Sequence, residues 1–291
     1  MTVLRESVIA RPVPAAREIR AARKPVGRWW LFTLTLLITV VVLIPVVVVI
    51  VLSVRPGVGS TTSSPITLEN FKDVFADTGV LQWLWNSLAV TLSVVLVSVL
   101  VAAPAGYVLS RGRSKAVSGY SLLLFVVQSL PVITAVIPLF ILFAKFGLVD
   151  SLLGLGIIYV GASMSVATWM MAAYMDSIPT SLEQAAWIDG CSPFGGFLRI
   201  VLRNSLPGIL STAIFTFLVS WNDYLVAIVF IRSQTTFTLP LGVESFFQQN
   251  QTSWGLVMAV AVVMMAPPIL VFATLNKYFS VGGIGGSLAG Q

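Results

Sequence analysis

The chain has 291 residues, of which 57% are hydrophobic and only 10% are charged, and its mean hydropathy is +0.96. Soluble domains carry about 25% charged residues, so this composition excludes an ordinary soluble fold and indicates a polytopic membrane protein. Histidine is absent and Cys191 is the single cysteine. These counts exclude an internal disulfide framework, a multi-thiolate metal site, a Ser-His-Asp triad and an HExxH zinc site.

The net charge of +6 is concentrated near the N-terminus, because seven of the seventeen Lys and Arg residues lie within residues 1–28. This composition is typical of a cytoplasmic tail held near anionic lipid, and not of a nucleic-acid-binding arm. A signal peptide is the alternative, but the apolar run that follows is too long and has no small-residue cleavage site. We therefore expect a cytoplasmic N-terminal tail over residues 1–28 and a transmembrane domain over residues 29–291.

Six apolar stretches are long enough to cross a hydrocarbon core of about 30 Å as helices, which predicts an all-α membrane protein. A short surface helix is also expected over residues 66–75. Prolines interrupt the third and sixth stretches, either as gentle kinks that assist packing or as hinges along a transport pathway. The predicted spans are residues 29–54, 84–109, 120–144, 152–175, 206–231 and 256–275, and the prolines are Pro131, Pro138, Pro267 and Pro268.

An even number of spans places both termini on the same side of the membrane. With the N-terminus in the cytoplasm, thirteen Lys and Arg residues fall in cytoplasmic segments and four fall outside. The positive-inside rule therefore predicts that both termini and the polar insert over residues 176–205 are cytoplasmic.

The polar insert contains signals for two short helices. Thr180 and Glu183 have the T-x-x-E spacing of a capping box, and Gly190 is a C-terminal stop signal. Ser192 followed by Pro193 is the signal for a second helix start. We therefore expect two short helices, joined at Gly190, at the cytoplasmic face.

Each insert helix is predicted to present a distinct face. The first insert helix carries no cation, whereas a helix that lies on lipid usually has Lys or Arg on its polar face. Its small alanines suit docking into a groove of another protein. A solvated linker is the alternative interpretation. The first face comprises Leu182, Ala185, Ala186 and Asp189, and the second helix has an apolar stripe of Phe194, Phe197, Leu198, Val201 and Leu202.

The insert resembles the EAA loop of permease subunits from ABC importers, whose pattern is E-A-A, three residues, Gly, nine residues, Ile, one residue, Leu-Pro. The spacing is kept by Gln184, Ala185, Ala186, Gly190, Ile200, Leu202 and Arg203. Gln184 stands where Glu is usual, and Arg203 stands where Pro is usual. The wording "EQAAWIDG", with "TLENF", "NSLAV", "SWNDYL" and "VGGIGGSLAG" elsewhere, is similar to the carbohydrate-uptake branch, and in particular to its smaller, maltose-type second permease.

The resemblance implies the transmembrane domain of a type I ABC importer in a bacterial cytoplasmic membrane, with the first insert helix as the coupling helix. The implied partners are a second homologous permease, two ATPase subunits, an extracytoplasmic sugar-binding protein and membrane lipid, with no nucleic acid. The implied ATPase contacts are Glu183, Gln184, Ala185, Ala186, Asp189 and Gly190. The glycines Gly282, Gly283, Gly285 and Gly286 either form a flexible end or, as the resemblance implies, reach the ATPase interface.

Asp223 is the only carboxylate well inside a predicted span. An acid there costs about 2.5–3.5 kcal/mol on insertion scales, so its side chain should face protein or water. One hypothesis is that Trp221, Asn222 and Asp223 line a sugar pathway, with Gln128 as a weaker candidate. The alternative is a structural hydrogen bond between two spans.

The sequence thus predicts a non-catalytic permease subunit that forms half of a sugar pathway and works by alternating access. The chain has no GxxxxGK[ST] motif, so ATP and Mg²⁺ are expected on separate ATPase subunits and no cofactor or metal on this chain. An ABC permease for a glycerol phosphate, a peptide or an amino acid is the alternative. A secondary transporter is disfavoured because internal repeats and buried ionisable groups are scarce, and a membrane enzyme because no catalytic cluster can be assembled.

Overall fold

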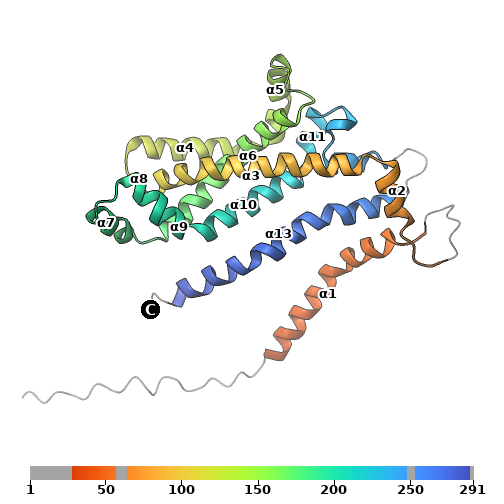
Figure 1. Ribbon diagram of the computed structural model, residues 1–291, viewed down its shortest axis with the longest axis horizontal. Coiled ribbons are helices and arrows are strands. Elements are labelled where there is room, and N and C mark those ends of the chain that lie inside the picture. Colours follow the sequence, from red (N-terminus) through yellow and green to blue (C-terminus); the bar gives the residue numbers. More distant parts are fainter. Residues whose placement is uncertain (1–27, 57–63, 248–252, 289–291) are drawn as a thin grey trace, which may run out of the picture. The chain divides into compact units, whose positions relative to one another are not determined.

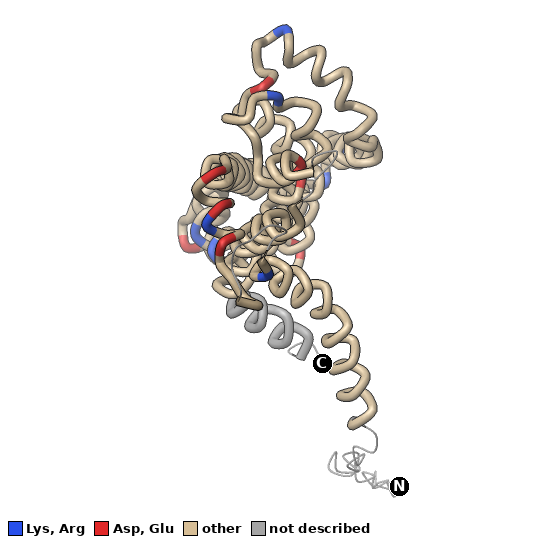
Figure 2. Tube along the Cα trace, turned by 90° about the vertical axis from the view of Figure 1, so that its right-hand side faces the viewer, with Lys and Arg blue, Asp and Glu red and all other residues tan. Residues whose placement is uncertain are grey.

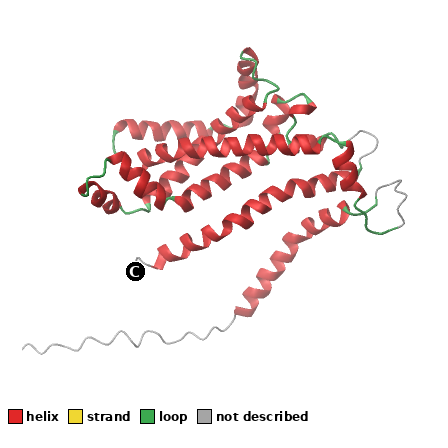
Figure 3. Ribbon diagram, in the orientation of Figure 1, coloured by secondary structure: helices red, strands yellow, loops and turns green. Residues whose placement is uncertain are grey.

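The computed structural model describes residues 28–56, 64–247 and 253–288, with only the helical backbone given for 276–288. The described chain consists of helices joined by loops and turns, and Figure 3 shows no strand in it. The chain divides into two compact units, residues 1–47 and 48–291, which are described separately.

The described part of the first unit is the N-terminal portion of helix α1 (Arg28–Ser53). Its span from Trp29 to Ser53 has a mean hydropathy of 3.3, which confirms the first predicted apolar span. The predicted basic tail, apart from Arg28 at the start of α1, lies outside the described residues.

Long apolar helices dominate the second unit. These are α3 (Val80–Arg111), α6 (Leu152–Asp176) and α13 (Trp254–Leu288), and the short surface helix appears as α2 (Glu69–Asp77). With α1, four helices of the described chain are long and apolar enough to cross a membrane, and up to six spans result if each of two bent pairs counts as one. Figure 2 shows long runs of these helices without a charged residue.

The third predicted span is not a single helix. It is divided into α4 (Lys115–Ser129) and α5 (Val132–Lys145), which meet at an angle of 94°. Leu130 is extended because the ring of Pro131 disfavours helical backbone in the residue before it. The interruption expected at Pro131 is therefore observed as a sharp break, whereas Pro138 lies inside α5 without a break.

The fifth predicted span, over 206–231, is also interrupted. Helix α10 (Leu206–Trp221) ends before Asn222, and a short helix α11 (Leu225–Phe230) follows. The next elements are the 3₁₀ turn η2 (Gln234–Thr236) and helix α12 (Leu239–Glu244). The sixth span is continuous, because Pro267 and Pro268 lie inside α13.

Helices α3 and α6 run parallel and side by side, and α10 packs against both (Figure 1). Small residues permit the close approach: a Cβ on Gly106 would lie 2.7 Å from the Met171 Cβ. Ser98 and Ser163 also form a hydrogen bond of 3.2 Å across this contact. The parallel pairing brings the C-terminal ends of α3 and α6 together, and the insert begins there.

At the opposite end of α3, side chains hold the segment between α11 and α12. The Asn86 amide donates to the carbonyls of Thr235 and Phe237, each at 2.8 Å, and the Trp83 indole donates to Gln234 at 3.1 Å. Helix α3 therefore connects the insert at one end with this segment at the other.

Asp150 lies in the loop between α5 and α6, and its hydrogen bonds hold this loop against the residues that follow α11. Its carboxylate accepts hydrogen bonds from the amides of Arg232 and Ser233 and from the hydroxyls of Ser233 and Thr236. Burial raises the pKa of Asp150, but these hydrogen bonds lower it by more and hold it well below its usual value. The carboxylate is therefore charged at any physiological pH.

Candidate functional site

The polar insert forms the two predicted short helices. The first is α7 (Thr180–Ile188), and the second combines α8 (Pro193–Gly196), the π-helical turn η1 (Phe197–Val201) and α9 (Leu202–Asn204). This second helix meets α10 at an angle of 72°.

Gly190 ends α7, as predicted. Its φ is +86°, a left-handed conformation that glycine adopts without steric cost. The Cys191 amide donates to Ala186 at 2.9 Å and the Gly190 amide to Trp187 at 3.1 Å. These two bonds are the Schellman motif, so the turn satisfies carbonyl groups that the end of α7 would otherwise leave free.

The second helix also begins as predicted, because the Ser192 hydroxyl accepts from the Gly195 amide at 3.1 Å and Pro193 follows it. The capping box predicted for α7 is wrong. Thr180 lies inside the helix, its side chain makes no cap bond, and Pro179 occupies the capping position. The carboxylate of Glu183 is instead engaged by another helix.

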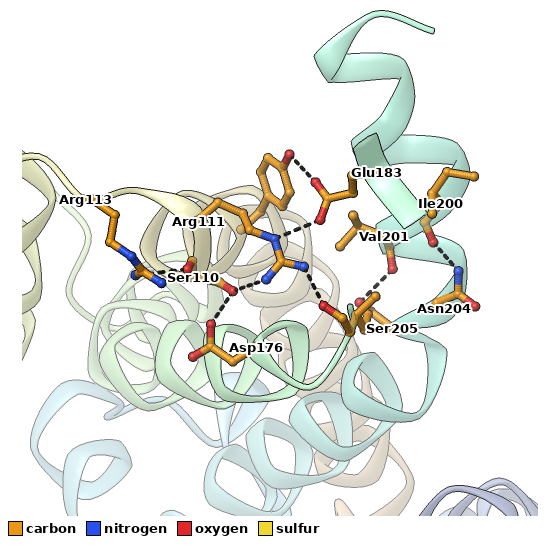
Figure 4. A network of polar contacts seen from close by, with 11 residues as sticks. Ser110, Arg111, Arg113, Asp176, Glu183, Ile200, Val201, Asn204 and Ser205 are labelled. Atoms are coloured by element: carbon orange, nitrogen blue, oxygen red, sulfur yellow. Dashed lines mark hydrogen bonds and ion pairs between the residues drawn. The ribbon is translucent and has the colours of Figure 1, made fainter. Parts of the chain in front are cut away.

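Glu183 is buried, with 1% of its surface exposed, and it is held by the last turn of α3 (Figure 4). Arg111 donates from Nε to Glu183 Oε1 at 2.8 Å, and the Tyr107 hydroxyl donates to Glu183 Oε2 at 2.7 Å. A buried carboxylate requires such a partner, because removing one member of a buried ion pair costs about 3–5 kcal/mol. Glu183 therefore joins α7 to α3.

The same turn of α3 also contacts the end of α6, the segment between α6 and α7, and the second insert helix. Arg111 Nη2 donates to the Ile178 carbonyl at 3.1 Å, and Ser110 donates to Asp176 at 2.5 Å. The Tyr107 ring also lies 4.8 Å from the ring of Phe197, centroid to centroid. We call Tyr107, Ser110, Arg111 and Glu183 the Arg111 network.

Sequence reasoning missed the α3 members of this network. Arg111 is one of the thirteen cations assigned to the cytoplasmic side, and nothing local links it to a carboxylate 72 positions later. The sequence contains only two signals for this ion pair: an arginine at the end of a predicted span and a glutamate in the polar insert.

The side chains of α7 other than Glu183 and Ala186 are exposed. Ile188 is 86% exposed, Leu182 46% and Trp187 43%, and Phe194 of α8 is exposed beside them. Of the predicted ATPase contacts, Gln184, Ala185, Asp189 and Gly190 are exposed and Ala186 is half-buried. Glu183 is buried and paired with Arg111 within this chain, and its implied contact with the ATPase stays a prediction.

The apolar stripe predicted for the second helix is divided. Phe197 and Val201 are buried against α3 and α6, whereas Phe194 and Leu198 are exposed. Leu202, the last residue of the predicted stripe, packs partly buried against the same cluster.

The predicted pathway residues do not form one site. Trp221 is buried, stacks on Phe217 with a centroid distance of 5.6 Å, and donates its indole N–H to Met264 of α13 at 3.2 Å. Asn222 is exposed and donates to the Leu218 carbonyl at 2.8 Å. Both side chains thus make contacts typical of packing and helix termination.

Asp223 and Gln128 line different cavities. Asp223 accepts from the Tyr159 hydroxyl of α6 at 2.7 Å, which is the structural bond between spans that the sequence offered as an alternative. It also lines a cavity of about 140 Å³ together with Ser220, whose buried hydroxyl has no hydrogen-bond partner. Gln128 lines cavities of about 330 and 420 Å³ between α4 and α6.

The four C-terminal glycines lie within α13, which continues to Leu288. Their surroundings lie outside the described residues, so both interpretations of this end stay predictions. No group of three or more His, Cys, Asp or Glu residues in the described chain is placed to hold a metal ion.

A bundle of apolar helices, two of them broken, with a short helical insert clamped at one end, defines a membrane transport subunit of the permease class. The chain belongs to the family described as binding-protein-dependent transport system inner membrane components, whose family model matches residues 102–281. This match contains α6, the whole insert and the Arg111 network.

Two relatives agree with this assignment, and a solved structure has the same fold. The chain is 31% identical to the maltodextrin transport system permease protein MdxG of Bacillus subtilis and to the arabinooligosaccharides transport system permease protein AraQ of Halalkalibacterium halodurans, in each case over 77% of this chain and 81% of the relative. A chain of a bacterial ABC transporter involved in import of the polysaccharide alginate shares the fold, with a TM-score of 0.73, 20% identity, and coverage of 88% of this chain and 98% of that chain.

Proposed function

We propose that this protein is a permease subunit of an ATP-driven ABC importer and that α7 is the helix that receives the ATPase subunit. The observation that carries the proposal is the exposure of three large apolar side chains of α7, Leu182, Trp187 and Ile188, in a polar insert outside the long apolar helices. Exposed apolar side chains grouped outside a membrane span favour a protein partner. Ala185 on the same helix allows close approach of that partner.

The energy for transport would come from the partner. The chain contains no P-loop motif, so ATP and Mg²⁺ would be bound by two ATPase subunits while this chain stays non-catalytic. A second permease and an extracytoplasmic binding protein would complete the importer. The thirteen cytoplasmic cations predicted by the positive-inside rule support both termini and α7 on the cytoplasmic side of a bacterial inner membrane.

The proposed substrate is a sugar or oligosaccharide. The names of two relatives, for maltodextrin and arabinooligosaccharides, support this class. Asp223 and Gln128 supply hydrogen-bonding groups beside cavities in the helix bundle, which suits ligands rich in hydroxyl groups. A glycerol phosphate, a peptide or an amino acid remains the alternative substrate class.

Closure of the ATPase pair would move α7 and rock the helix bundle between inward-open and outward-open states. Rigid-body rocking of this kind is an established route to alternating access. The helical backbone is interrupted between α4 and α5 and between α10 and α11. At these two breaks the bundle could bend without unwinding a helix.

Replacing Ile188 tests the docking proposal. Ile188→Asp puts a charge on the exposed α7 face, and we expect the purified importer to lose most of its ATPase subunit. Ile66→Asp is the matched control, because Ile66 is also exposed, at 67%, near α2 at the other end of α3. Mass spectrometry of the intact complex measures retention.

Two results would count against the proposal. A wild-type protein that never retains an ATPase subunit in mild detergent excludes an ABC importer, and equal retention by Ile188→Asp and wild type excludes α7 as the docking helix. Substrate class is tested separately by uptake into proteoliposomes of labelled maltodextrin, arabinooligosaccharide, glycerol phosphate, dipeptide and amino acid. Uptake of only the last three would exclude a sugar importer.

A further inference from the structure

The last turn of α3 makes hydrogen bonds both to α7 and to the short segment that connects α6 with α7. On the α7 side, Arg111 and Tyr107 both bond to the buried carboxylate of Glu183. In the joint itself, Arg111 bonds to the carbonyl of Ile178. Figure 4 shows the guanidinium of Arg111 bonded to the carboxylate of Glu183.

The covalent connections of α7 are short and turn sharply. On one side, the segment Ser177–Pro179 joins it to α6, and on the other the left-handed Gly190 joins it to α8. A load on the exposed face of α7 would rotate the helix about these joints unless side chains resist the rotation. The bonds from α3 to Glu183 and Ile178 lie where they can resist it.

We propose that the Arg111 network transmits movement of α7 to α3. Movement of the ATPase subunits would then reach the helix bundle through α3 as well as through the covalent connections of the insert to α6 and α10. The inference rests on the proposed function. Arg111, Tyr107 and Glu183 are positioning residues in this scheme, because they act through α3 and touch neither nucleotide nor transported solute.

The burial of the bond supports this role. Exposed ion pairs are weak and are screened by salt, whereas Glu183 is 1% exposed and both of its carboxylate oxygens are engaged. Coupling between distant sites requires packed contacts and rigid elements in sequence. Here the ion pair provides the contact and α3 provides the rigid element.

Helix α3 is well placed to carry the movement. It has 32 residues, or about 48 Å at 1.5 Å per residue. It contacts α6 closely at Gly106 and holds the segment between α11 and α12 through Asn86 at its far end. A displacement of Arg111 would therefore reach the opposite end of the bundle without passing through a broken helix.

The test uses the complete importer in proteoliposomes and measures solute transported per ATP hydrolysed. Glu183→Gln and Arg111→Gln each remove the ion pair, and we expect each to lower this ratio by about 5-fold or more, the lower end of typical allosteric couplings. The double variant should be no worse than either single variant, because all three lack the same interaction. Asp77→Asn, an exposed carboxylate of α2, is the control.

Tyr107→Phe provides a milder variant if the others fold poorly. It removes the hydroxyl that donates to Glu183 but keeps the ring against Phe197, and we expect a smaller fall in the same ratio with unchanged ATPase retention. A purely structural role would change stability or retention and leave the ratio intact.

The proposal is overturned if Glu183→Gln or Tyr107→Phe transports as much solute per ATP as wild type while retaining the ATPase subunit. Losses that multiply in the double variant would overturn it too, because the two residues would then act separately. Loss of the ATPase subunit from Glu183→Gln would assign the residue to docking instead. Failure of the wild-type protein to retain any ATPase would refute the proposed function, a result distinct from all of these.

Discussion

The Tyr159 hydroxyl on α6 donates a hydrogen bond of 2.7 Å to the carboxylate of Asp223, at the break between α10 and α11. The same carboxylate oxygen accepts from the amides of Val226 and Ala227 at 3.1 and 3.2 Å. Asp223 therefore satisfies free amides at the start of α11 and also joins the break to α6. The cost of an acid within the bundle is offset by these three donors.

Asp223→Ala should lower the thermal midpoint of the protein in detergent. The change leaves the Tyr159 hydroxyl and two amides without their acceptor, at a cost of roughly 1–3 kcal/mol. The double variant with Tyr159→Phe should lose less than the sum of the single losses, since the two residues share one bond. Strictly additive losses would contradict the shared bond.

Transport by Asp223→Ala tests whether Asp223 has only a structural role or also binds the substrate. If Asp223 also binds the sugar through its cavity with Ser220, the KM for uptake should rise even when the amount of folded importer is matched to wild type. An unchanged KM, with the amount of folded importer matched to wild type, would remove Asp223 from any substrate role.

Gly190→Ala should weaken the turn between α7 and α8. A φ of +86° costs a non-glycine residue about 1–2 kcal/mol, so we expect lower retention of the ATPase subunit on copurification. Gly119→Ala is the matched control, because a Cβ at Gly119 in α4 meets nothing within 4 Å. The control should be neutral or slightly stabilising, and equal retention by the two variants would exclude a role for the turn.

Gly106→Ala should destabilise the bundle by roughly 1–3 kcal/mol, as overpacking of a tight contact does. The added methyl group would lie 2.7 Å from the Met171 Cβ and 2.9 Å from the Ala172 nitrogen, so α3 and α6 must separate. Gly161→Ala on α6, where a Cβ has open space, should leave the thermal midpoint near the wild-type value. A Gly106→Ala protein as stable as the control would show that the two helices can part at little cost.

Stability should not depend on the ionisation of Asp150 at any pH that a cell meets. Its folded-state pKa lies well below the usual value, so its contribution is complete above the unfolded pKa of about 3.9 and declines only as the pH falls further. We expect the difference in thermal midpoint between wild type and Asp150→Asn to be constant from about pH 8 to pH 5 and to shrink below about pH 4. A difference that shrinks between pH 7 and pH 6 would contradict the lowered pKa.

Local signals in the sequence predicted much of this protein correctly. Long uncharged runs located α1, α3, α6 and α13, because a helix that crosses lipid must satisfy its own backbone and shield it with apolar side chains. Gly190 and the pair Ser192-Pro193 located the insert turn, since these residue types favour the required backbone conformations.

The same reasoning failed where a distant residue competes for a local signal. The spacing of Thr180 and Glu183 suits a capping box, but Arg111 and Tyr107 bind the carboxylate more strongly than a backbone amide would. Likewise, Pro131 and Pro138 both interrupt an apolar run, and only the first breaks its helix. Which proline a helix tolerates depends on the neighbours that pack around it.

The sequence by itself determined the class of this protein, the position of most of its spans and the helical pair of its insert, because hydropathy, capping and turn preferences act over a few residues. Only the tertiary structure decided which face of α7 is free and which is clamped. That division depends on the parallel packing of α3 and α6, which brings Arg111 to Glu183 across 72 positions of chain. No local preference encodes such a contact, since its energy arises only when burial removes both charges from water.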